Sequence, residues 1–182
     1  MISDLFAPSR TEQALRATRQ EVEVIGPLFR LSGTLELHGF RRVSDYVTHQ
    51  AEGLNLRDAT LLNKRGMPTA DRVPRLIIRM PDVTLVGQRY VFAPDPTDDE
   101  QRIEKVHRRI AALTDGHYIE GTVSLYPGAD LVAFLQATDP PFLPLLDVRI
   151  RWLTDRRLKS RFEFALLNRR QVIGVAPLDH AE

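Results

Sequence analysis

The sequence predicts an α+β fold that is mainly antiparallel β, built from two tandem copies of one small unit. The first observation behind this prediction is that framework residues of the first half return in the same order in the second. The second is that each half joins apparent helices to short strands of alternating polarity. The recurring residues are Glu12, Gln13, Leu15, Leu31, Gly33, Thr34 and Leu37, which return as Glu100, Gln101, Ile103, Ile119, Gly121, Thr122 and Leu125. Repetition over most of a chain indicates a duplicated unit, so we expect copy one in residues 1–92 and copy two in residues 93–182.

Each copy is predicted to open with a helix. In copy one, Ser9 is a suitable N-cap and Glu12 completes a capping box, which predicts a helix over residues 10–21. In copy two, Ile103, Val106 and Ile110 follow the spacing of one helical face and predict a helix over residues 100–113.

A strand, a short helix and a second strand are predicted next in each copy. Period-two alternation with Thr and Val predicts the first strands, over residues 29–37 and 118–125. Gly33 and Gly121 interrupt these strands and predict a sharp bend or a close backbone approach. Apolar triads predict the short helices over 43–47 and 131–135, and the second strands follow over 54–62 and 142–152.

A hairpin is predicted to close each copy. Its strands are expected over 75–80 and 83–88 in copy one, and over 162–167 and 171–175 in copy two, with Val86-Gly87 matching Ile173-Gly174. Pro and Asn/Asp at the intervening turns have a physical basis in a fixed φ and in local side-chain bonding. The unit therefore reads helix, strand, short helix and three strands, which would form a small curved sheet or close into a small barrel.

The strands that end copy one resemble the Sm-like small β-barrel superfamily. The residues that carry the resemblance are Asn55-Leu-Arg-Asp-Ala59, followed by the run from Leu76 to Val86. The resemblance implies RNA contacts at Asn55 and Arg79, and association by strand pairing, with the tandem copies standing for two adjacent subunits of a ring. The sequence departs from the family where Arg79 is followed by Met80 instead of glycine, and where the Arg79 position of copy two is read as apolar.

Composition excludes several classes of site. The 182 residues include no cysteine, so disulfides and cysteine-ligated metals are absent. A net charge of +1 demands no polyanionic partner. We expect a cytoplasmic protein with no membrane-spanning segment, no cofactor and no metal.

Candidate catalytic and metal residues are few, and each has a more ordinary interpretation. Ser44 and Asp45 beside His38 suggest a dyad, but Asp45 also suits the first turn of a helix. His38 and His49 flank the same helix as a two-ligand metal candidate, against a reading as surface residues. Asp58 and Asp147 recur at one place, where they either bind a cation or mark the start or bend of a strand.

The strongest functional indication is a basic segment over residues 149–170. Clustered cations beside an aromatic ring are typical of surfaces that bind single-stranded nucleic acid. An ordinary solvated strand face and an acidic protein partner are the alternatives. The candidate residues are Arg149, Arg151, Trp152, Arg156, Arg157, Lys159 and Arg161, with Asn55 and Arg79 added by the resemblance.

No constellation in the sequence predicts catalysis. The leading hypothesis is therefore a non-catalytic interaction or scaffold protein, binding a protein partner or itself through strand edges. The alternative is an Sm-like RNA or single-stranded nucleic-acid binder that uses the basic segment. The apolar stretch 140–146 is either a buried connection or a docking patch.

Overall fold

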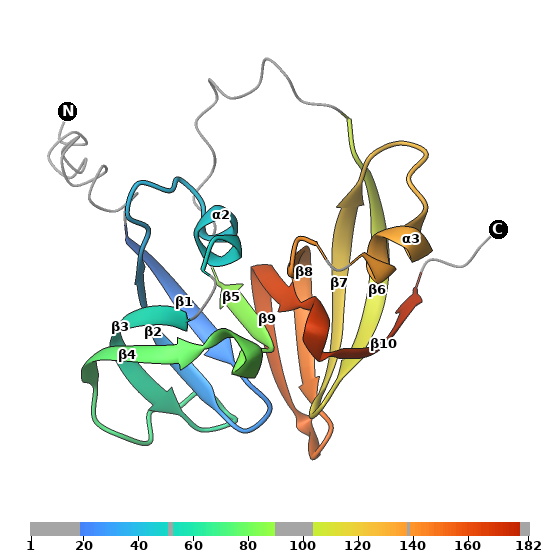
Figure 1. Cartoon of the computed structure of the whole chain (residues 1–182). Helices are drawn as coiled ribbons and strands as arrows, with labels where there is room; N and C mark the ends of the chain where they lie inside the picture. The colour runs from blue at the N-terminus through green and yellow to red at the C-terminus, as the bar shows by residue number, and fades with distance from the viewer. Residues whose placement is uncertain (1–18, 51–52, 90–103, 138, 179–182) are drawn as a thin grey trace, which may run out of the picture.

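The described residues of the chain form one antiparallel sheet of ten strands in the order β10-β6-β7-β8-β9-β5-β1-β2-β3-β4 (Figure 1). A computed structural model describes residues 19–50, 53–89, 104–137 and 139–178. In these residues the only helices are two six-residue α-helices and two short 3-10 turns. The sheet is open, with β10 and β4 at its two edges. The predicted α+β class and the alternative of a closed barrel are therefore wrong, because the described chain is almost wholly strand and its outermost strands do not meet.

The two halves of the chain contain the same succession of elements. The N-terminal half consists of β1 (Arg19–Ile25), β2 (Arg30–Glu36), α2 (Val43–Thr48), β3 (Gly53–Leu62), β4 (Val73–Arg79), η1 (Met80–Asp82) and β5 (Leu85–Gln88). The C-terminal half consists of β6 (Val106–Thr114), β7 (His117–Leu125), α3 (Leu131–Gln136), β8 (Phe142–Trp152), β9 (Asp155–Asn168), η3 (Arg169–Gln171) and β10 (Val172–Pro177). The strand order β5-β1-β2-β3-β4 of the first half recurs as β10-β6-β7-β8-β9 in the second.

The helices predicted at the start of each half are wrong wherever the structure describes their residues, because these residues form strands. Within the predicted helix 100–113, β6 occupies the residues from Val106 onward and pairs with β7 without interruption, from Val106↔Leu125 to Thr114↔His117. Continuous backbone pairing with a neighbouring strand outweighs a helical spacing carried by three apolar residues. Residues 19–21 of the other predicted helix belong to β1, and residues 10–18 lie outside the described part.

The predicted closing hairpins do not form. β4 pairs with β3, whereas β5 pairs with β1 and β9; likewise β9 pairs with β8 and β5, whereas β10 pairs with β6. The 3-10 turns η1 and η3 explain the difference, because each redirects the chain from one strand to a non-adjacent one. Val86 pairs with Val24, and the corresponding residue opposite Ala112 is Val175, so the predicted match of Val86 to Ile173 is displaced by two residues.

Both halves bend at the same place in the sheet. The β2–β3 register shifts at Gly33, and the β7–β8 register shifts at Gly121. The residues bulged on the partner strands are Asp58 and Asp147, whose φ angles of 48° and 49° lie in the left-handed region. A Cβ at Gly33 would lie 2.5 Å from Leu56 Cγ. Of the two predicted alternatives, the close backbone approach is confirmed at Gly33, where a Cβ would also lie 2.8 Å from the Arg57 carbonyl oxygen.

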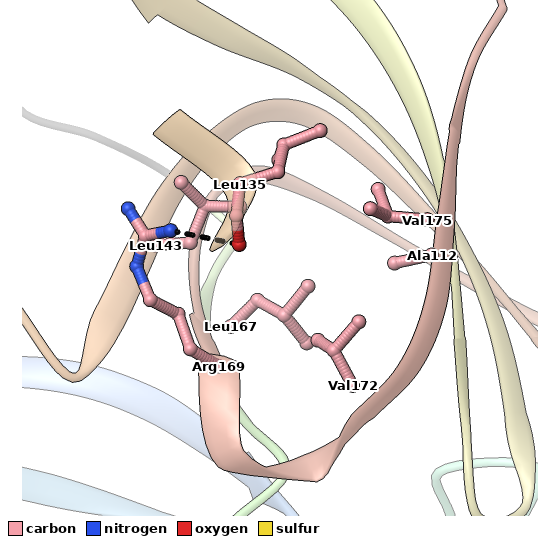
Figure 2. Close-up of a pocket in the computed structure, with 7 residues that line it drawn as sticks. All are labelled: Ala112, Leu135, Leu143, Leu167, Arg169, Val172 and Val175. Carbon is pink, nitrogen blue, oxygen red and sulfur yellow. Dashed lines mark hydrogen bonds between the residues drawn. The ribbon is translucent and has the colours of Figure 1, made fainter. Parts of the chain in front are cut away.

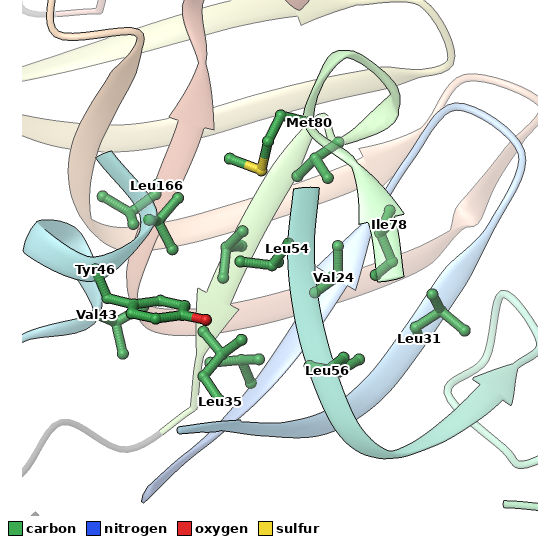
Figure 3. Close-up of a cluster of buried hydrophobic side chains, with 14 of the residues drawn as sticks. Val24, Leu31, Leu35, Val43, Tyr46, Leu54, Leu56, Ile78, Met80 and Leu166 are labelled. Carbon is green, nitrogen blue, oxygen red and sulfur yellow. The ribbon is translucent and has the colours of Figure 1, made fainter. Parts of the chain in front are cut away.

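Each half completes the hydrophobic core of the other. The N-terminal core includes Phe142 and Leu166 from β8 and β9, and the C-terminal core includes Ile25 and Leu85 from β1 and β5. Figure 3 shows Leu166 beside Tyr46 and Val43 of α2. β5 is consequently buried along its whole length, and we call the β5–β9 junction the seam.

Candidate functional site

Four of the predicted basic residues lie on one exposed face of the sheet. Along β8, Arg149 and Arg151 are exposed while Ile150 and Trp152 are buried. The β8–β9 register places Arg161 opposite Arg149, and Lys159 opposite Arg151. Like charges directly opposite each other on neighbouring strands repel, so this face, which we call the basic face, favours an anionic ligand. Arg157 is exposed nearer the hairpin, and the side chain of Arg156 lies outside the described part.

Acidic residues neutralise part of the basic face. Glu120 of β7 accepts a charged hydrogen bond from Arg151, and its other oxygen lies 3.6 Å from Arg109 Nη2. Asp147 lies 3.9 Å from Arg161 Nη2, with both side chains largely exposed. Among the described contacts, Arg149 and Lys159 have no such ion pair, so they are the cations most available to a ligand.

Trp152 does not contribute a stacking surface to this face. Its side chain is 5% exposed and belongs to the C-terminal core, where it packs edge-on against His117 at 5.4 Å and beneath the Arg30 guanidinium at 5.5 Å. Strand alternation turns Trp152 away from the face of Arg151, so little of its ring is exposed for the predicted stacking.

The aromatic ring that does lie on the basic face is Tyr118. It stands opposite Arg151 in the β7–β8 register, and the Arg151 guanidinium lies 4.6 Å above its ring. Together with Trp152, Leu153 and Lys159 these side chains line a shallow hollow. Sequence reasoning missed Tyr118, although its alternation with buried Ile119 is the signal that could have placed it on this face.

Asn55 and Arg79 are not brought to the basic face. They lie on β3 and β4, at the other end of the sheet. Asn55 accepts a hydrogen bond from Arg75 at 3.1 Å, and Arg79 pairs with Asp82 at 2.8 Å. By the strand registers, Asn168 of the C-terminal half occupies the position that Arg79 occupies in the N-terminal half. The prediction that this position is apolar in the second half is therefore wrong, because asparagine is polar.

The catalytic and metal candidates around α2 are not assembled into a site. His38 lies 4.0 Å from Glu36, and His49 bonds the Asp45 carbonyl at 2.6 Å through its ring nitrogen. Ser44 Oγ donates to Asp45 at 3.3 Å on an exposed surface. Within the described residues, no group of three or more histidines and carboxylates is placed to hold a metal ion.

The two edges of the sheet expose apolar side chains. On β4, Ile77 is 62% exposed, and Val73 is also exposed; on β10, Ile173 and Val175 are exposed. An unpaired edge with exposed apolar residues is a ready template for another strand. Prolines and arginines on these strands limit how long a paired segment they can form, since Pro177 has no backbone N–H to donate.

A small apolar hollow lies between the β10 edge and α3 (Figure 2). Arg169 closes one side of it, donating to the carbonyl oxygens of Phe134 at 2.6 Å and Leu135 at 3.4 Å and so fixing the end of α3. Burial lowers the pKa of Arg169 from its ordinary value. The lining residues are Ala112, Leu135, Leu143, Leu167, Arg169, Val172 and Val175.

The apolar stretch 140–146 is partly buried and partly exposed. Phe142 enters the N-terminal core, while Leu143 and Leu145 enter the C-terminal core. Only Pro140, Pro144 and Leu146 of this stretch are exposed. The stretch therefore serves mostly as the start of β8, which leaves the sheet edges as the apolar surfaces of interest.

Comparisons with protein-family models, curated proteins and solved structures find no match. Of the helices that the structure describes, none has the length and apolar character needed to cross a membrane. The basic face and the two sheet edges are therefore the candidate functional surfaces of the molecule.

Proposed function

We propose that this protein is a non-catalytic interaction or scaffold protein, built from a duplicated small β unit, whose binding surfaces are the free edges β4 and β10. The observation that carries the proposal is the exposure of Ile77 on one edge and of Val175 on the other. Both strands lack a partner on their outer side within the described sheet. Edge pairing supplies backbone hydrogen bonds, and side chains on alternate positions supply specificity.

The seam supports this proposal because it is an edge pairing of the same kind inside one chain. There, four residues of β5 pair with β9, from Leu85↔Leu167 to Gln88↔Phe164. Asn168 reinforces the junction by donating to the carbonyl oxygens of Val83 at 2.8 Å and Met80 at 3.3 Å. A short ladder therefore suffices when apolar side chains cover it.

Light scattering and amide hydrogen exchange over a range of protein concentrations test the proposed function. We expect the mass to rise above the 20.7 kDa of one chain as concentration increases. Backbone amides of β4 and β10 should become protected over the same range, with the amides of the β5–β9 seam protected throughout. A constant single-chain mass with freely exchanging edges would contradict the proposal.

The convergence of four cations across β8 and β9 favours a second candidate function, binding of single-stranded nucleic acid. In this candidate Arg149, Lys159 and Arg161 neutralise phosphates, and Tyr118 provides the aromatic surface on which a base stacks. The Sm-like resemblance would instead direct RNA to Asn55 and Arg79, so the two readings differ in the residues they require.

A labelled single-stranded oligonucleotide distinguishes these possibilities. If the basic face binds it, the double variant Arg149→Ala/Lys159→Ala should weaken binding at about 50 mM salt and reduce the slope of affinity against salt by roughly two. Arg41→Ala/Arg65→Ala removes the same charge from exposed positions of the N-terminal half and serves as the control. Equal effects of the two double variants, or no binding by the unaltered protein, would exclude this candidate.

A further inference from the structure

The hollow beside β10 corresponds to a filled part of the N-terminal half. Positions in the two halves can be matched by the strand registers, because Leu54 pairs with Ile78 as Leu143 pairs with Leu167, and Val24 pairs with Val86 as Ala112 pairs with Val175. The seven residues that line the hollow thus match seven residues of the N-terminal half. These are Val24, Val47, Leu54, Ile78, Met80, Val83 and Val86, all of them buried members of the N-terminal core.

Part of the cover over those seven residues comes from the other half of the chain. Leu166 of β9 crosses the seam into the N-terminal core and is 1% exposed (Figure 3). Its strand neighbours Ala165 and Leu167 point the opposite way, into the C-terminal core. α2 also contacts β8 across the seam. The described residues provide α3 and the hollow with no equivalent cover.

The residue that matches Leu166 on the other edge is Ile77. Since Ile78 corresponds to Leu167, Ile77 occupies the Leu166 position on β4. Its neighbours Leu76 and Ile78 face the N-terminal core, so Ile77 faces outward and is 62% exposed. One edge of the molecule therefore carries the apolar side chain that the hollow at the other edge lacks.

We propose that the partner at these edges is a second copy of this chain, joined β4 to β10 in the register of the seam, with Ile77 in the hollow beneath α3. This inference rests on the proposed function and specifies its partner. The expected pairs are Ile78↔Gly174, Ile77↔Val175 and Leu76↔Ala176, by correspondence with Leu167↔Leu85, Leu166↔Val86 and Ala165↔Gly87.

The junction between chains is expected to be weaker than the seam. At the seam, Phe142 adds a large side chain to the N-terminal core. At the proposed junction between chains the matching residue is Gly53, which has no side chain to add. Pro177 matches Gln88 and brings no backbone donor to the last pair of the ladder. We therefore expect the chains to associate reversibly, to an extent that depends on protein concentration.

Disulfide trapping tests the register directly, because the natural chain contains no cysteine. Chains carrying Ile77→Cys are mixed with chains carrying Val175→Cys and oxidised mildly. Directly paired residues on neighbouring strands have Cβ atoms about 4.5–5.5 Å apart, close enough for a disulfide with small adjustments. We expect a cross-linked dimer containing one chain of each variant.

The matched control replaces Ile77→Cys with Val73→Cys, an exposed position on the same face of the same strand. It lies about 13 Å from the expected partner along the strand and should not cross-link. Equal yields from both mixtures, or a predominant Ile77→Cys homodimer, would overturn the proposed register. If the chains self-associate but cross-link in one of these ways, the proposed register fails and the proposed function stands. If the chains do not associate at all, both the register and the proposed function fail.

Discussion

His117 is buried at the start of β7, and neither of its ring nitrogens has a hydrogen-bond partner among the described residues. The pKa of His117 is lowered from 6.5 to about 4, mainly because burial desolvates the ring; the nearby Lys64 acts in the same direction and Asp115 opposes the change. The folded protein therefore resists protonation of a group that the unfolded chain protonates readily.

Stability should accordingly fall as the pH decreases from 6.5 toward 4, and this contribution should be fully present above 6.5. The gap between these pKa values corresponds to about 3 kcal/mol as an upper limit. His117→Phe keeps a ring against Trp152 and removes the titrating group. Urea unfolding at pH 7 and pH 4.5 should show a smaller loss for the variant than for the natural protein. Parallel losses in the two proteins would refute this account of His117.

A buried charged residue makes the strand β1 difficult to predict from its sequence pattern. Buried Val22 and Val24 alternate with charged residues, but Glu23 is buried as well. Its carboxylate lies 2.7 Å from Arg30 and 2.5 Å from Arg89, so paired charges occupy a place that a strand pattern normally reserves for apolar residues. One of these partners, Arg89, lies 66 positions away in the chain and cannot be read from the local sequence.

Strands and short helices with a clear local pattern were predictable at the scale of elements. β8 has the predicted bounds, and the apolar triads placed α2 and α3 to within one residue. The pairing of strands was not predictable in the same way, because η1 and η3 carry the chain past the adjacent strand. The faces of Tyr118 and Trp152 follow from local alternation instead, which puts Trp152 on the buried side with Ile150 and Tyr118 on the side opposite Ile119.

Asn168 offers a test of the turn that holds the seam. It is buried, donates to two carbonyl oxygens of the N-terminal half, and accepts from the Arg170 backbone at 3.1 Å. Asn168→Ala leaves these groups without their partner and should lower the free energy of unfolding by about 1–3 kcal/mol. Arg79→Ala changes the matching, exposed position of the other half and should cost less than about 1 kcal/mol. Chemical denaturation would compare the two, and equal costs would contradict the role given to Asn168.

At the scale of the whole molecule, the recurring strand order leaves one edge of each kind unpaired while the seam joins the other two. An interface between unlike edges is heterologous, so association would continue from chain to chain until it closes or is interrupted. A substitution on one edge should consequently be complemented by an intact edge on a second chain.

Mixing two edge variants tests most directly whether the β4 edge of one chain pairs with the β10 edge of another. Ile77→Glu places a charge on β4, and Val175→Glu places one on β10, both at exposed positions. Light scattering should give a single-chain mass for each variant alone, at concentrations where the natural protein associates. An equimolar mixture should give twice the 20.7 kDa of one chain and no more, because one intact β4 edge meets one intact β10 edge. A mixture that stays at the mass of one chain, or variants that associate as the natural protein does, would contradict the account.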